Sequence, residues 1–243
     1  MDNILSIHLY RAEYTPAVIA RLKGCFPLLE VDGASGLHQT NFFVGQLSPQ
    51  DVTNLRNDLL FYDLNPFIPL ENLCSRLDNY HPNNDSQREM LHFANKLVEL
   101  NDDSMGAGLY MHGEAGIGKS HIAVGISKQF MLRGLQPNFQ PADRYTFNQS
   151  LDLRPGQVWI IDDLNSGFGM ASRLFKSVML NAHERGGRVF VTSNKPYEEM
   201  LKEMMVGDSP ANRVRYDDRT RSMMKVLHVT GESFRQQKAW YLE

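Results

Sequence analysis

The segment from Gly113 to Ser120 constrains this chain most, because it reads Gly-Glu-Ala-Gly-Ile-Gly-Lys-Ser. It stands between a short apolar run, Leu109 to Met111, and a helix-like run that begins at His121. Glycines let the backbone curl so that N–H groups point at phosphate oxygens, the lysine reaches the β and γ phosphates, and the hydroxyl takes one Mg²⁺ position. The pattern therefore predicts a phosphate loop for a nucleoside triphosphate, the alternative being a glycine-rich turn that caps a helix. The residues expected to contact the nucleotide are Gly113, Glu114, Ala115, Gly116, Ile117, Gly118, Lys119, Ser120 and His121.

Length and composition limit the classes of protein to which the chain could belong. A chain of 243 residues with 42% apolar content suits one α/β domain with a small appendage. Cys25 and Cys74 form no Cys-x-x-Cys pair, which argues against a disulfide framework and a structural zinc site. No apolar run approaches the roughly 20 residues that span a bilayer, and the start lacks the features of a signal peptide. We therefore expect a cytoplasmic protein with no membrane partner.

Charge gives no general attraction for nucleic acid, because the net charge is −3. Basic side chains nevertheless gather late in the chain, between Arg213 and Lys225. Two interpretations stay open for them: an ordinary solvated face, or a surface that meets phosphate or a neighbouring subunit.

Short apolar segments alternate with helical ones from about residue 108 onward, which is typical of a parallel sheet. The expected strands are Gly108 to His112, Pro137 to Gln140, Val158 to Ile161, Arg188 to Val191 and Val226 to Thr230. The expected helices between them are His121 to Leu132, Ala171 to Glu184 and Tyr197 to Met205. Because a strand candidate separates the loop helix from the acidic strand, this order favours an inserted central strand, as in additional-strand ATPases, over a simple nucleotide kinase.

The N-terminal part has a different pattern, which predicts a small α+β domain over residues 1–65 and a nucleotide-binding domain over residues 66–243. Its expected strands and helices are Ile4 to Leu9, Phe42 to Val44, Thr15 to Leu22 and Ser48 to Leu60. The run Asn65 to Pro69 is the expected joint. Helices at Leu70 to Leu77 and Ser86 to Leu100 are expected to lead into the phosphate loop.

Polar residues at the ends of the later strands are candidates for catalysis. Asp162 and Asp163 follow a buried strand, where Asp162 could hold Mg²⁺ and Asp163 could orient the attacking water; the alternative is a cap or turn after the strand. Asn194 ends the next strand and could hold the water or sense the γ-phosphate, or could simply form a turn. Arg219 and Arg235 are candidates to stabilise phosphoryl charge, although either arginine alone could be an ordinary surface residue.

Together these motifs, over roughly Leu70 to Lys238, resemble AAA+ ATPases of the DnaC-type helicase loader and IstB-type transposition group. The similar elements are Asp162-Asp163-Leu164, the strand ending Thr192-Ser193-Asn194, and Asp218-Arg219 followed by Gly231-Glu232-Ser233-Phe234-Arg235. The resemblance implies an ATP-binding P-loop NTPase with a five-stranded parallel sheet and without a C-terminal helical lid domain. It also implies Asn194 as sensor 1, Arg219 as the arginine finger and Arg235 as sensor 2.

These expectations lead to one main functional hypothesis and several rivals. The main hypothesis is an Mg²⁺-dependent ATPase that assembles as an ATP-dependent homo-oligomer and acts on a protein partner such as a helicase or transposase. A nucleotide-dependent binding module with little hydrolysis is the alternative, favoured by Asp163 in place of Glu and by the short segment Pro141 to Gln157. A DNA-remodelling role rests on the resemblance and the basic tail, and a small-molecule kinase lacks an acceptor-binding signature.

Overall fold

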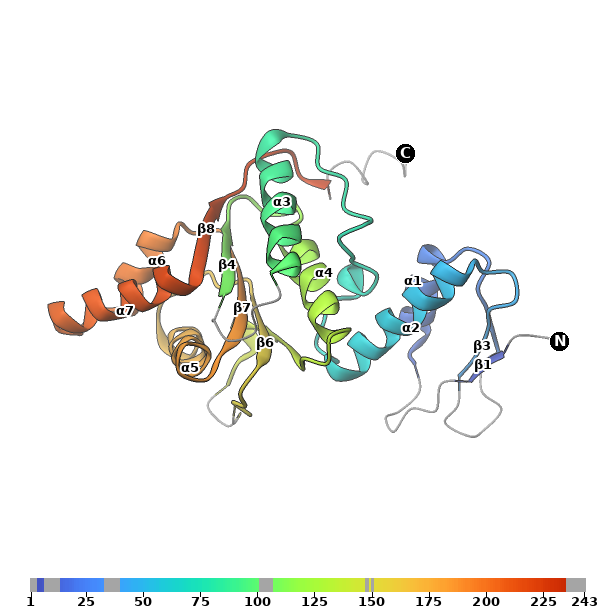
Figure 1. Ribbon diagram of the computed structural model, residues 1–243, viewed down its shortest axis with the longest axis horizontal. Coiled ribbons are helices and arrows are strands. Elements are labelled where there is room, and N and C mark those ends of the chain that lie inside the picture. Colours follow the sequence, from blue (N-terminus) through green and yellow to red (C-terminus); the bar gives the residue numbers. More distant parts are fainter. Residues whose placement is uncertain are drawn as a thin grey trace. The chain divides into compact units, whose positions relative to one another are not determined.

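The computed structural model describes residues 4–6, 14–32, 40–100, 107–146, 149 and 151–234 (Figure 1). The chain divides into two compact units, Met1–Ser75 and Arg76–Glu243. The boundary expected at residue 65 thus falls inside the first unit, because Leu73 and Cys74 belong to that unit's core. Among the described residues, no helix combines the length and apolar character needed to cross a bilayer.

The first unit is a small antiparallel sheet with two helices, as the sequence predicts in outline. Its elements are β1 (Ile4–Ser6), α1 (Pro16–Cys25), β2 (Glu30–Asp32), β3 (Asn41–Phe43), α2 (Pro49–Leu64) and a 3₁₀ turn at Leu70–Asn72. The strand order is β1-β3-β2. Thr15 and Ser48 cap the two helices with their hydroxyls, and each helix continues past the end expected from sequence.

The helix expected at Leu70 to Leu77 is wrong. Only the 3₁₀ turn Leu70–Asn72 forms, and the chain then turns through hydrogen bonds of the i to i+3 type, such as Ser75 N to Asn72 O at 3.1 Å. The amide of Asn79 accepts a hydrogen bond from Arg76 N at 3.0 Å. Asparagine side chains compete with the backbone for hydrogen bonds in this way, which favours turns over helix.

The second unit is a three-layer α/β domain, in agreement with the expected P-loop NTPase fold. Its elements are α3 (Asp85–Glu99), β4 (Ala107–His112), α4 (Lys119–Met131), β5 (Pro137–Pro141), a 3₁₀ turn at Ala142–Arg144, β6 (Gln157–Asp162), α5 (Gly169–Arg185), β7 (Gly187–Ser193), α6 (Tyr197–Met204), α7 (Pro210–Met223) and β8 (Met224–His228). Helices α3 and α4 cover one face of the sheet, and α5, α6 and α7 lie on the other (Figure 1).

All neighbouring strands of the five-stranded sheet are parallel, in the order β5-β6-β7-β4-β8. The inserted strand expected from the order of the motifs is confirmed, since β7 lies between the loop strand β4 and the acidic strand β6. The carboxyl ends of all five strands therefore meet at one edge, which is where ligands bind in sheets of this kind.

Alternating side chains of the central strands pack on the two helical layers. Val189 and Val191 of β7 join the core cluster beneath α5, while Phe190 stacks on Phe130 of α4 with ring centroids 6.2 Å apart. Because both faces are covered, the strands are nearly continuous apolar runs. Gly108 of β4 lets the strands approach, because a Cβ atom there would lie 2.0 Å from Val189 O.

Candidate nucleotide-binding site

The phosphate loop joins β4 to α4, as predicted from sequence. Helix α4 begins at Lys119, directly after Gly118, whose φ of 95° is left-handed and which has no side chain to cap the helix. A Cβ atom on Gly118 would lie 2.4 Å from the ring of Tyr80, whose hydroxyl donates to Ile117 O at 3.0 Å. Helix α4 therefore begins without a side-chain cap, and the N-terminus of a helix favours an anion.

Lys119 lies in the mouth of the loop with only 5% of its surface exposed. Its ammonium group donates to Gly113 O at 2.8 Å and to Glu114 O at 2.6 Å. The same nitrogen lies 3.3 Å from Oδ1 of Asn194, which follows β7. The fold therefore brings together the loop lysine and the polar amide that the sequence places far apart.

Ser120, the last residue of the phosphate loop, contacts the acidic strand β6. Its hydroxyl donates to Oδ1 of Asp162 at 2.7 Å, and the hydroxyl of Thr192 donates to the same oxygen at 2.7 Å. Burial raises the pKa of Asp162, while the hydrogen bonds from Ser120 and Thr192 act in the opposite direction. Two oxygen donors suited to Mg²⁺, a hydroxyl and a carboxylate, are thus in contact.

Asp163 differs sharply from its neighbour, because its side chain is exposed. Its φ of 53° is left-handed, and within the described residues no other residue except glycine has a positive φ. Asp163 N donates to the hydroxyl of Thr192 at 2.9 Å, and Asn165 N donates back to Asp163 O at 2.8 Å. The chain therefore turns sharply at the end of β6, and the second carboxylate stands at the surface of the same sheet edge.

The C-terminal motif around Ser233 lies against the outer side of the phosphate loop. A Cβ atom on Gly116 would meet the hydroxyl of Ser233 at 2.0 Å, and Phe234 N donates to Gly116 O at 2.9 Å. His121, in the first turn of α4, has contacts of its own: its Nε2 lies 2.9 Å from Arg76 O and 3.0 Å from Oδ1 of Asn79. The imidazole of His121 is therefore engaged by the segment that precedes α3.

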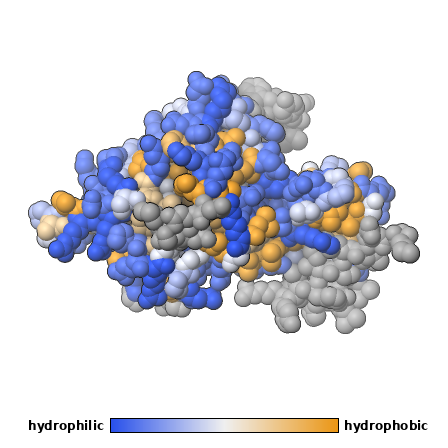
Figure 2. Space-filling view, in the orientation of Figure 1, coloured by the Kyte–Doolittle hydropathy of each residue, from blue (hydrophilic) through white to orange (hydrophobic). Residues whose placement is uncertain are grey.

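Of the two candidate arginines, the one that the structure describes is not brought to this cluster. Arg219 lies on α7 with an exposed side chain. Apart from the residues drawn in grey, the face of the molecule in Figure 2 is mainly hydrophilic, with apolar residues scattered over it. In the part of the chain that the structure describes, its guanidinium forms no ion pair or hydrogen bond with the phosphate loop. Arg235 lies outside the described residues.

Three residues that build the site were not singled out by sequence reasoning: Thr192, Asn165 and Tyr80. Thr192 connects Asp162 to Asp163, Asn165 accepts a hydrogen bond from Asn194 N at 2.7 Å, and Tyr80 packs on Gly118. Only Thr192 carried a signal, because a polar side chain near the end of an apolar strand is unusual. The partners of Asn165 and Tyr80 are distant in sequence, so no local pattern could have found them.

No protein-family model and no curated protein matches the sequence. Solved structures do match. The crystal structure of DnaI aligns with 69% of this chain and 94% of its own, at 21% identity and a TM-score of 0.56. The crystal structure of the DnaC helicase loader aligns with 66% of this chain and 99% of its own, at 20% identity and a TM-score of 0.50.

At identities this low, the structural matches show that the fold is shared. The resemblance inferred from the phosphate loop, the acidic strand and the Thr192-Ser193-Asn194 strand end is thereby confirmed at the level of fold. The chain has the P-loop NTPase fold of the DnaC-type loaders.

Proposed function

We propose that the protein is an Mg²⁺-dependent AAA+ ATPase that binds and hydrolyses ATP to drive a change in a protein partner. The observation that carries this proposal is the hydrogen bond of 2.7 Å between the Ser120 hydroxyl and the Asp162 carboxylate, next to Lys119 and Asn194. Phosphoryl transfer relies on positioned charge more than on covalent chemistry by the protein. A buried lysine, a carboxylate, a hydroxyl and an amide at one sheet edge match that requirement.

Each residue of the site then has a definite role. The N–H groups of the loop and the ammonium of Lys119 bind phosphate oxygens, and Ser120 and Asp162 hold the metal. The two oxygen donors fit Mg²⁺, because they are hard ligands already in contact. When bound, Mg²⁺ neutralises charge on the phosphate oxygens.

Water activation falls to Asp163 and Asn194. The exposed carboxylate of Asp163 can accept a proton or orient a water, and the amide of Asn194 offers both a donor and an acceptor beside Lys119. The proposed assignment of Arg219 is a finger that reaches the γ-phosphate of a neighbouring copy. Its side chain is exposed on α7, and its guanidinium forms no hydrogen bond or ion pair within the described part of its own chain, which supports a role between protomers. Arg235 is assigned to the bound nucleotide by the motif alone.

The proposed partner is a helicase, with a transposase as the other possibility that the resemblance raises. The shared fold with a protein described as a helicase loader supports the first choice. In this proposal the chain forms an ATP-dependent oligomer, and its N-terminal unit is the surface that recognises the partner. A direct role on DNA has weaker support, because the net charge is −3.

A second candidate function is a nucleotide-dependent switch that hydrolyses ATP slowly. The short side chain of Asp163 favours it, because an aspartate reaches one methylene less far toward an attacking water than a glutamate would. Single-turnover hydrolysis with protein in excess separates the two functions. A switch keeps bound ATP intact for many minutes, whereas an ATPase converts it to ADP within the time of its catalytic cycle.

Titration calorimetry with millimolar ATP and Mg²⁺ tests the central proposal. Lys119→Ala should weaken binding roughly tenfold to a hundredfold, because hydrogen bonds to charged groups are lost. Lys96→Ala, which removes an exposed lysine from the last turn of α3, is the matched control and should bind as the wild type does. Absence of heat for the wild type, or unchanged affinity in Lys119→Ala, would refute nucleotide binding at this loop.

Arg219→Ala tests the contribution between protomers. We expect it to bind ATP normally and to lose turnover, because an arginine finger stabilises charge only in the transition state. Arg213→Ala, another exposed arginine of the same helix, serves as the control. Normal hydrolysis by Arg219→Ala would remove this residue from the site.

A further inference from the structure

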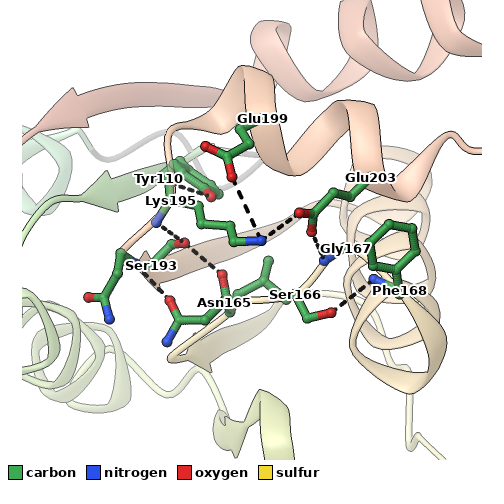
Figure 3. A network of polar contacts seen from close by, with 11 residues as sticks. Tyr110, Asn165, Ser166, Gly167, Phe168, Ser193, Lys195, Glu199 and Glu203 are labelled. Atoms are coloured by element: carbon green, nitrogen blue, oxygen red, sulfur yellow. Dashed lines mark hydrogen bonds and ion pairs between the residues drawn. The ribbon is translucent and has the colours of Figure 1, made fainter.

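A polar network joins the loop after β6 to the turn after β7 (Figure 3). Asn194 N donates to Oδ1 of Asn165 at 2.7 Å. The hydroxyl of Ser193 donates to Leu164 O at 2.6 Å and accepts from Lys195 N at 3.0 Å. Ser193, which precedes Asn194, is therefore bonded to the β6–α5 loop, and Lys195, which follows Asn194, is bonded to Ser193.

A second connection runs through α6. The ammonium of Lys195 donates to Glu203 at 2.5 Å, and the other carboxylate oxygen of Glu203 accepts from Gly167 N at 2.8 Å. Gly167 packs directly on the helix, because a Cβ atom there would lie 2.4 Å from the Cβ of Glu203 (Figure 3). The β6–α5 loop is therefore held on both sides, which makes it a firm support for Asn165.

We propose that Asn165 is a positioning residue that holds Asn194 at the γ-phosphate, an inference that rests on the proposed ATPase function. Asn165 lies in the turn that follows Asp163 and reaches across to the backbone of Asn194. By fixing that backbone, it keeps the amide of Asn194 beside Lys119, where the two groups are 3.3 Å apart.

A merely structural role would have a different signature. Asn165 and Asn194 both have exposed side chains, so removing their hydrogen bond leaves no buried group without a partner. The stability of the domain should therefore change little. The hydrolysis step should change more, because a small displacement of a catalytic group lowers the rate without preventing binding.

The test compares three variants of the full chain. Asn165→Ala removes the acceptor, and Asn165→Asp keeps an acceptor oxygen for Asn194 N. Ser166→Ala is the matched control, because Ser166 lies in the same loop and accepts from Phe168 N at 3.3 Å without touching Asn194. The measurements are single-turnover hydrolysis at saturating ATP, affinities for ATP and ADP, the thermal midpoint, and hydrogen exchange of the Asn194 amide.

We expect Asn165→Ala to lose the exchange protection of Asn194 and to hydrolyse ATP roughly tenfold more slowly, with nearly unchanged ADP affinity and thermal midpoint. Asn165→Asp should recover most of the rate, and Ser166→Ala should match the wild type. A rate for Asn165→Ala within about twofold of the wild type, or a joint fall of rate, ADP affinity and thermal midpoint, overturns the proposal.

The experiment also separates this inference from the proposed function. A wild type that binds ATP without hydrolysing it refutes the ATPase function. The positioning role is then tested by hydrogen exchange of the Asn194 amide and by the ratio of the affinities for ATP and ADP. In that case Asn165→Ala should lose both the protection of the Asn194 amide and the preference for ATP over ADP. Retention of both would overturn the positioning role by itself.

Discussion

Thr192→Val should destabilise the second unit even though valine has almost the same shape as threonine. The Thr192 side chain is fully buried, and its hydroxyl donates to the Asp162 carboxylate at 2.7 Å and accepts from Asp163 N at 2.9 Å. A hydrogen bond to a charged group contributes about 1.5–3 kcal/mol and a neutral one about 1 kcal/mol. We therefore expect the free energy of unfolding to fall by about 2–4 kcal/mol, which corresponds to roughly 4–16 °C in Tm for a domain of this size.

Thr192→Ser is the matched control, because it keeps the hydroxyl and loses one buried methyl group, worth about 1 kcal/mol. Thermal and urea unfolding followed by tryptophan fluorescence would measure both variants, since Trp159 lies buried in β6. The expected order of stability is wild type, then Thr192→Ser, then Thr192→Val. A valine variant as stable as the serine variant would show that these hydrogen bonds contribute nothing, and the reasoning would be refuted.

Two further predictions concern the phosphate loop and the first unit. Gly118→Ala should weaken ATP binding measured by calorimetry, because the new Cβ atom would lie 2.4 Å from the ring of Tyr80. Gly134→Ala is the control and should leave the affinity unchanged, because Gly134 has a positive φ of 88° but no atom near its Cβ position. Equal affinities for the two variants would contradict this prediction. Burial raises the pKa of Asp63 to about 6, partly offset by the hydrogen bond from the hydroxyl of Tyr14. Because this pKa exceeds the ordinary value of 3.8, the stabilising contribution of the protonated carboxyl is fully present below pH 3.8 and is lost as the pH rises through about 6. Asp63→Asn should therefore be more stable than the wild type at pH near 8 and similar near pH 4 in urea unfolding, and a pH-independent difference would disprove the assignment.

The parallel sheet and the loop at its candidate-site edge could be predicted from sequence because the relevant signals are local. Apolar runs with both faces buried, and glycines followed by lysine and serine, mark β4, β6, β7 and the phosphate loop without knowledge of distant contacts. Gly186 follows α5 with a φ of 70°, a backbone conformation that glycine adopts readily. These segments lie within a few residues of their expected positions.

Elements with weak local signals were missed. Helix α7 buries only Thr220 and Met223, so it has no apolar stripe that a periodic pattern could reveal. Strand β2 covers only Glu30–Asp32 and depends on its pairing with β3. The boundary between the units was placed too early, because the burial of Leu73 and Cys74 in the first core is a long-range effect.

The position of Asn194 follows from the topology of the sheet. Because β7 lies between β4 and β6, the residue that follows β7 must stand between the phosphate loop and the acidic strand. Asn194 therefore reaches Lys119 on one side and Asn165 on the other, at 3.3 and 2.7 Å. A strand order in which β4 and β6 were neighbours would place this amide outside both loops. The same insertion lets Thr192 contact Asp162, so one strand supplies both the support of the metal ligand and the group that meets the γ-phosphate in the proposed mechanism.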